Sequence, residues 1–210
     1  MGVEQGLRER KKRETRRLIS DVATMLFVER GFDAVTVAEI AARAGVAPKT
    51  VFNYFPRKED LFLDRLEELS AMVTAAVRGS GPGVGAPDAL LALVLDLLAQ
   101  RHPLSGYAEP GYVHFWQVII DSPPLQARVR EYVQELEDLL AALIAERSGG
   151  AEPDFRARFA AAAAVSAYRT VYLDGARRVF AGEDHEAVAA ALASQYARAF
   201  DAAQRSIAAL

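Results

Sequence analysis

Residues 36–58 read TVAEIAARAGVAPKTVFNYFPRK and contain the start and stop signals of two short helices. Thr36 and Glu39 have the spacing of a capping box, in which each side chain bonds the backbone N–H of the other residue. Gly45 favours the end of that helix, because glycine takes a positive φ without a steric penalty. Pro48 suits the first position of a second helix, where its missing N–H is not needed. The stretch therefore predicts two short helices joined by a turn.

Two short helices joined by a glycine-containing turn form a helix-turn-helix, the unit that places its second helix in the major groove of DNA. We expect the helices at about residues 37–44 and 48–55, with polar or basic side chains on the outer face of the second. Val51, Phe52 and Phe55 are interpreted as core residues. The alternative is an ordinary helical hairpin inside an all-α core.

The charge of the chain is distributed unevenly. The 210 residues carry a formal net charge of −3, but residues 1–58 hold 12 Lys and Arg against 7 Asp and Glu, a net +5. Residues 59–210 hold 13 against 21, a net −8. A basic helix-turn-helix on an acidic body is the electrostatic pattern of a sequence-specific DNA-binding protein. The basic run Arg8–Arg17, taken alone, is equally consistent with a solvated helix face.

The composition argues against several other classes of protein. The chain has no cysteine, which excludes disulfides and thiolate metal sites and fits a reducing cytoplasm. No apolar run approaches the roughly 18 residues that span a bilayer, and the basic N-terminus is not followed by the apolar segment of a signal peptide. We therefore expect a cytoplasmic protein that does not enter the membrane.

Hydrophobic periodicity predicts helices along the rest of the chain. The composition of residues 112–121 would also fit a strand, but their helical surroundings favour a short buried helix that ends before Pro123. The last helix has an apolar face that either the same chain or a second copy must cover. The expected fold class is all-α. Besides the two short helices, we expect helices at residues 11–30, 58–78, 88–101, 112–121, 125–147, 154–180 and 185–208.

A longer block resembles the N-terminal module of the TetR family of bacterial one-component transcriptional regulators; over residues 26–62 it reads LFVERGFDAVTVAEIAARAGVAPKTVFNYFPRKEDLF. The turn glycine and the aromatic-rich ending occur at the family's spacing. The resemblance implies about nine helices, with an N-terminal three-helix helix-turn-helix domain at residues 1–57. A larger helical domain for effector binding and dimerisation follows at residues 58–210. The resemblance also implies a homodimer, joined through its last two helices, on a palindromic operator with half-sites about 34–36 Å apart.

The second helix of the helix-turn-helix carries the candidate base contacts. Lys49 and Thr50 lie at its N-terminal end, where Lys can donate to guanine and Thr can bond a base edge or touch a thymine methyl group. Asn53, one turn further on, can read adenine or bind a phosphate. Tyr54 matches the family position whose phenol contacts the DNA backbone.

Two further residues are candidate phosphate contacts. Lys58 is expected to begin the next helix, where its ammonium group and the helix N-terminus both favour a phosphate. Thr36 caps the first helix, and in the family this region also meets phosphate. Arg57 departs from the family, which commonly has a small capping residue there; since Arg cannot cap a helix, it can add a phosphate contact instead.

An aromatic cluster with the only Trp of the chain is the candidate effector pocket, because such pockets are mostly apolar with a few polar groups. Residues 121–149 and the alanine-rich helix after them weakly resemble the subgroup of the family said to bind acyl-CoA-like ligands. A flat aromatic or lipophilic compound is the other candidate effector. The residues expected to line the pocket are His102, Tyr112, Phe115, Trp116, Ile119, Tyr168, Arg169 and Tyr172. The candidate dimer contacts are Val165, Leu192, Tyr196 and Phe200.

The sequence has no signature of an enzyme. It contains no Gly-rich phosphate loop after a strand and no nucleophile motif, and its three histidines are too scattered for a metal site. We expect no cofactor and no bound metal. The sequence thus predicts a ligand-responsive transcriptional regulator, a repressor that a small effector releases from its operator. A transcriptional activator and an architectural DNA-binding protein are the alternatives.

Overall fold

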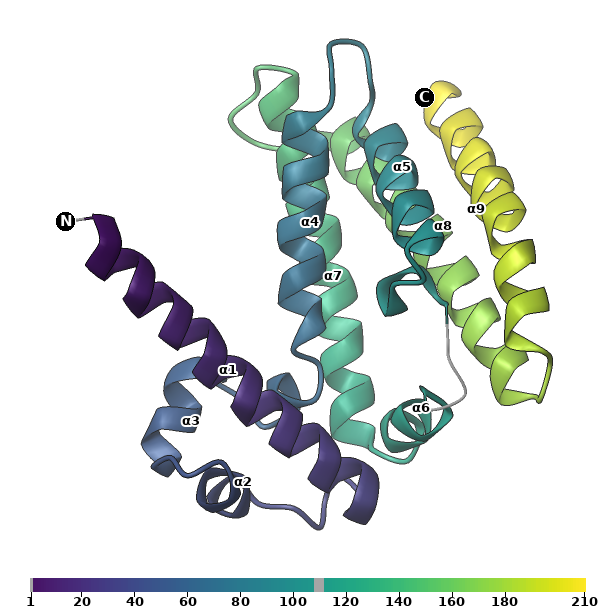
Figure 1. The fold of residues 1–210 in the computed structure, drawn as a ribbon. Helices are drawn as coiled ribbons and strands as arrows, with labels where there is room; N and C mark the ends of the chain where they lie inside the picture. Colours follow the sequence, from purple (N-terminus) through teal and green to yellow (C-terminus); the bar gives the residue numbers. More distant parts are fainter. Residues whose placement is uncertain (1, 108–111) are drawn as a thin grey trace. The chain divides into compact units, whose positions relative to one another are not determined.

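The computed structural model describes residues 2–107 and 112–210, and every regular element in this part of the chain is helical (Figure 1). This confirms the all-α fold class. The α-helices are α1 (Gly2–Arg30), α2 (Val37–Arg43), α3 (Pro48–Tyr54), α4 (Arg65–Gly79), α5 (Ala86–Ala99), α6 (Tyr112–Ile120), α7 (Pro123–Arg147), α8 (Phe155–Phe180) and α9 (His185–Ala208). Two short 3-10 helices are η1 (Glu59–Leu61) and η2 (Pro103–Ser105).

The chain forms two compact units. The first unit contains Met1–Asp64 together with His114–Val129, and the second contains Arg65–Val113 together with Arg130–Leu210. The first unit thus includes most of α6 and the start of α7 as well as the helix-turn-helix. The functional boundary at residue 57 stays a prediction, because compactness alone does not tell which segments bind DNA.

In the first unit, α1, α2 and α3 share one apolar core. Ile19 and Phe27 of α1, Ile40 of α2 and Val51 of α3 have no exposed surface. These residues recur at helical spacing in α1 and sit at the inner positions of the two short helices. The resulting three-helix core agrees with the capping and turn signals of residues 36–58.

Helix α1 is longer than the periodicity predicts. It begins at Gly2 rather than at residue 11. Residues 2–10 contain no apolar stripe, which is why periodicity does not reveal them, but they include several good helix formers such as Glu, Gln, Leu and Arg. The helix ends as expected at Arg30, where Gly31 takes a φ of 82°.

The expected helix start at Lys58 is wrong. Lys58 precedes η1, and α4 begins only at Arg65. The reason is that Leu61, Phe62 and Leu63 are all buried. Three consecutive residues cannot share one face of an α-helix, because each is turned by about 100° from the last. A 3-10 turn and an irregular stretch place all three side chains in the core instead.

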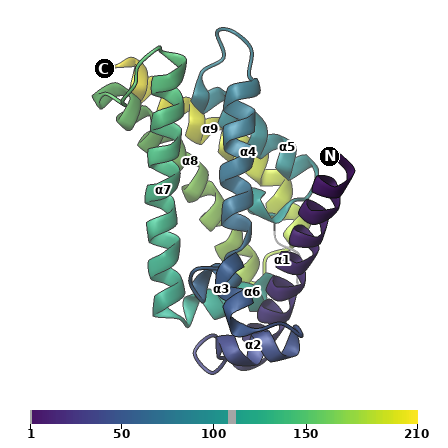
Figure 2. The same cartoon turned by 90° about the vertical axis from the view of Figure 1, so that its left-hand side faces the viewer.

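The second unit is built around the antiparallel pair α8 and α9, and α4 and α5 also lie side by side (Figure 1, Figure 2). Small residues allow α8 and α9 to approach closely. A Cβ atom added at Gly175 of α8 would lie 3.0 Å from Cδ2 of Leu192 on α9. The bounds of α9 agree with the sequence prediction at both ends.

The apolar face of α9 is covered by the same chain, which decides between the two alternatives left open above. All four candidate dimer contacts are fully buried in the core of the second unit. Their side chains therefore do not form a surface for a second copy, and that assignment is corrected. A dimer contact through α8 and α9 would have to use the outward residues of these helices. The four buried residues are Val165, Leu192, Tyr196 and Phe200.

Across residues 2–107 and 112–210, none of the helices combines the length and the apolar character that a bilayer span requires.

Candidate nucleic-acid interface

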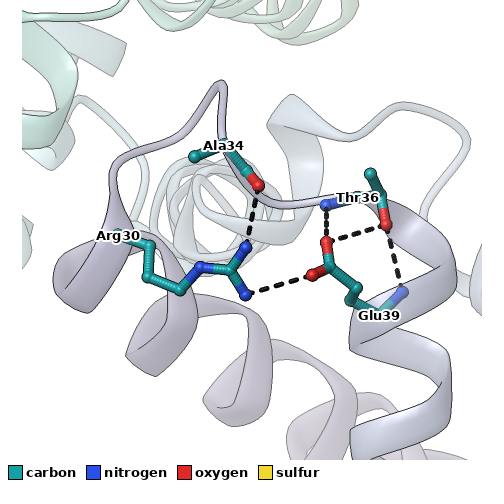
Figure 3. Close-up of polar contacts among 4 residues, drawn as sticks. All are labelled: Arg30, Ala34, Thr36 and Glu39. Atoms are coloured by element: carbon teal, nitrogen blue, oxygen red, sulfur yellow. Dashed lines mark hydrogen bonds and ion pairs between the residues drawn. The ribbon is translucent and has the colours of Figure 1, made fainter.

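The capping box at the start of α2 is present in both directions (Figure 3). The Thr36 backbone N–H donates to Oε2 of Glu39 at 2.8 Å, and the Glu39 backbone N–H donates to Oγ1 of Thr36 at 3.2 Å. Arg30 extends the network, since its guanidinium donates to Oε1 of Glu39 and to the Ala34 carbonyl, both at 3.1 Å. The bonds from Thr36, with Arg30 adding to them, lower the pKa of Glu39. The network fixes where α2 begins relative to the end of α1.

The turn between α2 and α3 has the predicted conformation. Gly45 takes a φ of 68°, and the Val46 N–H donates to the Ala41 carbonyl at 3.0 Å. This backbone bond closes the end of α2 in the manner of a Schellman motif. Pro48 occupies the first turn of α3. The turn therefore sets the angle at which α3 leaves α2.

The outer face of α3 is polar, basic and aromatic. Lys49 and Asn53 are exposed, and Thr50 and Tyr54 are half-buried. The assignment of Phe52 to the core is wrong, because its side chain is 50% exposed. Lys49, Phe52 and Asn53 stand at i, i+3 and i+4, so they share one face of the helix. Phe52 is thus a candidate contact residue that the sequence interpretation missed; its position on the face of Lys49 and Asn53 was the available signal.

Arg16 of α1 holds the C-terminal end of α3. Its Nη1 donates to the Tyr54 carbonyl at 2.8 Å, and its guanidinium lies 4.4 Å from the centre of the Phe55 ring. A cation at a helix C-terminus interacts favourably with the unpaired carbonyls and the helix dipole. This role of Arg16 could not be read from the sequence, where the residue is one of seven cations in a basic run.

Lys58 faces the interior of the first unit. Its Nζ donates to the Phe32 carbonyl at 2.6 Å and lies 4.2 Å from the centre of the Phe32 ring and 5.6 Å from that of Phe27. Desolvation lowers the pKa of the ammonium, against an opposing effect of nearby carboxylates such as Asp33. Because Lys58 does not begin an α-helix, the helix-terminus argument for a phosphate contact no longer applies. A contact between Lys58 and DNA stays a prediction, and only the positive charge of the side chain now supports it.

Helix α6 packs on the first unit through an aromatic series. Phe115 stacks on Phe62 with ring centres 4.4 Å apart, and Phe62 meets Phe27 edge-on at 5.7 Å. Trp116 meets Phe115 edge-on at 6.2 Å. In the same unit, Nε of Arg128 lies 2.8 Å from Oδ1 of Asp60 in a partly buried ion pair between α7 and η1.

The residues expected to line an effector pocket are divided between the two units. Phe115, Trp116 and Ile119 belong to the first unit, and the other five belong to the second. The structure therefore does not bring the eight together in one unit. Sequence reasoning grouped them by residue type. The type of a residue does not tell which of the two units its side chain packs in. The five in the second unit are His102, Tyr112, Tyr168, Arg169 and Tyr172.

In the second unit, two tyrosines hold the segment around η2. The Tyr168 hydroxyl donates to the Leu104 carbonyl at 2.7 Å, and the Tyr196 hydroxyl donates to the Ser105 carbonyl at 2.9 Å. His102 caps the same turn, since its Nδ1 accepts from the Leu104 N–H at 3.3 Å. Burial raises the pKa of Tyr168, so its proton stays available for this bond.

Among the described residues, two pockets of moderate size can be described, and the eight expected effector residues do not line either of them. One, of about 390 Å³, lies in the first unit between the end of α1, the following loop and α6. The other, of about 410 Å³, lies in the second unit between the start of α5, the end of α7 and the start of α8. The described residues contain no group of three His, Cys, Asp or Glu side chains that could hold a metal ion.

Two parts of the chain match known sequence families. Residues 19–64 match the family described as bacterial regulatory proteins, tetR family, and residues 109–192 match the MftR C-terminal domain. The first match covers the capping box, the turn and α3. The second begins before α6 and reaches into α9.

Individual relatives extend this similarity over most of the chain. The HTH-type transcriptional regulator TcmR of Streptomyces glaucescens is 32% identical over 157 residues, which cover 73% of this chain and 70% of TcmR. The nucleoid occlusion factor SlmA of Pasteurella multocida is 29% identical over 144 residues, which cover 64% of this chain and 65% of SlmA.

A solved structure has the same fold. Thermus thermophilus FadR, a TetR-family transcriptional repressor in complex with lauroyl-CoA, aligns over 90% of this chain and 93% of its own, with a TM-score of 0.51. The sequence identity is 24%, so this likeness concerns the fold alone.

Proposed function

Since the chain belongs to the TetR family of transcriptional regulators, we propose that it is a repressor that binds a palindromic operator as a homodimer. We further propose that a small lipophilic or aromatic effector releases it from the operator. The chain is a regulator and not an enzyme.

The observation that carries the proposal is the outer face of α3. Lys49, Phe52 and Asn53 share this face and are exposed, while Val51 is buried on the opposite side. A helix with a donor, an apolar group and an amide on one face has the chemistry that reads base edges in the major groove. Lys49 and Asn53 are proposed as base contacts. Thr36, Thr50, Tyr54 and Lys58 complete the proposed DNA-contacting set.

The dimer contact is proposed on the outward residues of α9. Ala190, Ala193 and Ala197 are exposed there, and small side chains allow a helix of a second copy to approach closely. A two-fold dimer would present two copies of α3 to half-sites about one helical turn apart.

The effector is proposed to bind in the second unit, beside the tyrosines of α8. Five residues remain candidates for its contacts: His102, Tyr112, Tyr168, Arg169 and Tyr172. A ligand that competes for the Tyr168 hydroxyl would loosen the segment around η2, which leads on to α6. It releases DNA only if it binds this loosened state better than the DNA-bound state. An acyl-CoA is one candidate, because FadR is described as a complex with lauroyl-CoA.

A second function rests on one comparison. SlmA is described as a nucleoid occlusion factor and not as a transcriptional regulator, so an architectural role on DNA is kept as the alternative. The two functions differ in whether a ligand changes the affinity for DNA.

Selection of bound DNA from a random pool by the purified full chain tests the proposal. We expect a palindromic sequence, and we expect Lys49→Ala to relax the preference at one base position of each half-site. Binding without any sequence preference would contradict it. Acyl-CoAs and flat aromatic compounds are then added to the complex with the selected DNA, and release by one class identifies the effector chemistry.

A further inference from the structure

The N-terminal half of α1 is a basic helix whose role the proposed function leaves open. Residues 8–17 carry seven Lys and Arg against two Glu. The structure continues α1 through this run without a break, from Gly2 to Arg30. Arg8, Lys11 and Lys12 are exposed. The run is therefore a rigid charged rod and not an irregular tail.

One face of this rod is oriented by a contact. Arg16 bonds the Tyr54 carbonyl at 2.8 Å, so its side of α1 faces the C-terminal end of α3. Lys12 and Arg8 precede Arg16 by four and eight residues, and residues spaced by four lie on neighbouring positions of one helix face. At about 1.5 Å per residue, their Cα atoms lie roughly 6 and 12 Å further along α1.

Arg8 and Lys12 thus continue the α3 side of the first unit beyond the recognition helix. A helix in the major groove is bordered by the sugar-phosphate backbones, and Lys and Arg are the usual partners of phosphate oxygens. We propose that Arg8 and Lys12 bind phosphates of the operator duplex that flank the groove occupied by α3. This inference rests on the proposed function, because it needs α3 to lie in the groove.

Two other basic residues of the run, Arg10 and Lys11, point away from this face. Arg10 and Lys11 are turned by about 120° and 140° from Arg16 around the helix axis. Nε of Arg10 also lies 3.5 Å from Oε1 of Glu14 on the same helix. This pair provides a matched control, because it carries the same charge on the same two turns but on another face.

The test compares Arg8→Gln/Lys12→Gln with Arg10→Gln/Lys11→Gln in the full chain. Each double variant removes two positive charges from exposed positions, and circular dichroism checks that helix content and melting temperature are kept. The measurement is the affinity for the selected operator at several salt concentrations. Each lost phosphate contact lowers the slope of log K against log salt by about 0.9. We expect a decrease of about 1.8 for Arg8→Gln/Lys12→Gln, with an unchanged sequence preference, and a much smaller change for the control.

Equal decreases for the two variants would overturn the proposal, because they would indicate diffuse attraction by charge alone. So would an unchanged slope for both. In either case, a relaxed base preference of the Lys49→Ala variant would still support α3 as the helix that contacts the bases, so the proposed function would stand. If the wild-type chain binds no duplex DNA, the proposed function fails and this inference fails with it.

Discussion

Phe52 changes the chemistry of the proposed interface at the scale of one residue. A half-exposed phenyl ring on α3 gains nothing from phosphates, but it can contact the 5-methyl group of thymine in the major groove. Lys49 and Asn53 on the same face would then read the neighbouring bases. An apolar contact of this kind leaves a specific experimental trace, because the thymine methyl group can be removed without changing the hydrogen bonds of the base pair.

We predict that replacing thymine by uracil in the operator weakens binding at one position per half-site, by about 3- to 10-fold for an apolar contact of this size. In Phe52→Ala the same replacement should have no effect at that position. Affinity for the two DNAs is measured by titration. A methyl effect that persists in Phe52→Ala would assign the contact to another residue, and Asn53→Ala is the matched control on the same face.

Lys58 is predicted to act on stability as well as on charge. Its ammonium bonds the Phe32 carbonyl at 2.6 Å and lies over the Phe32 ring. Lys58→Ala leaves that carbonyl without this donor, at a cost of about 1–3 kcal/mol in the free energy of unfolding of the first unit. Denaturant unfolding measures it. Arg57→Ala, an exposed neighbour with the same charge, serves as the comparison, and equal stability of the two variants would contradict the structural role.

At the scale of elements, α2 depends on its cap. Hydrogen bonds from Thr36 lower the pKa of Glu39 below its ordinary value of 4.5. The folded state therefore favours the ionised form of Glu39 more than the unfolded state does. This contribution is complete above pH 4.5 and is lost as the pH falls through the lowered pKa.

We predict that Glu39→Gln melts at a lower temperature than the wild type at pH 6, and that the difference shrinks as the pH falls towards 3. Gln keeps the shape of the capping residue but not the charge that pairs with Arg30. Melting is followed by circular dichroism. A difference that is the same at both pH values would show that the charge of Glu39 is irrelevant to the cap.

Local signals in the sequence were sufficient for elements whose ends are set by nearby residues. The capping box of Thr36 and Glu39 and the turn at Gly45 are examples, since each involves bonds within a few residues. The same signals predicted α6 correctly as a short helix, but they failed for the helix start at Lys58 and did not show where the side chains of α6 pack. Lys58 is placed by Phe32, 26 residues away, and Phe115 is placed by Phe62. Such pairings depend on packing between distant segments, and helical periodicity does not specify which distant segment is the partner.

At the scale of the whole molecule, the two faces of α9 have different roles: the buried face stabilises the fold, and the exposed face is the proposed dimer contact. Leu192 lies inside the second unit, whereas Ala197 on the same helix is exposed. The two positions therefore report on different properties of the chain. One contributes to the core of each copy, and the other is available for a contact between copies.

We predict that Ala197→Arg converts the proposed homodimer to a monomer with little change in melting temperature, because the larger charged side chain blocks close approach. Analytical ultracentrifugation measures the mass. Leu192→Ala should instead lower the stability of the fold by about 2–5 kcal/mol through a cavity. Ala142→Arg, an exposed position on α7, is the control; a monomer in that variant too would place the contact elsewhere.

The stacking of Phe115 on Phe62 bears on how such a chain can be divided or recombined. A fragment that ends at Asp64 would contain the whole helix-turn-helix but would leave the Phe62 ring without the helix that stacks on it. The proposed DNA-binding segment therefore does not contain all of the residues that its own core packs against. Exchange of the effector-binding part between related regulators, in the laboratory or in evolution, would keep this stacking contact only if the incoming part carries an aromatic side chain at the position of Phe115.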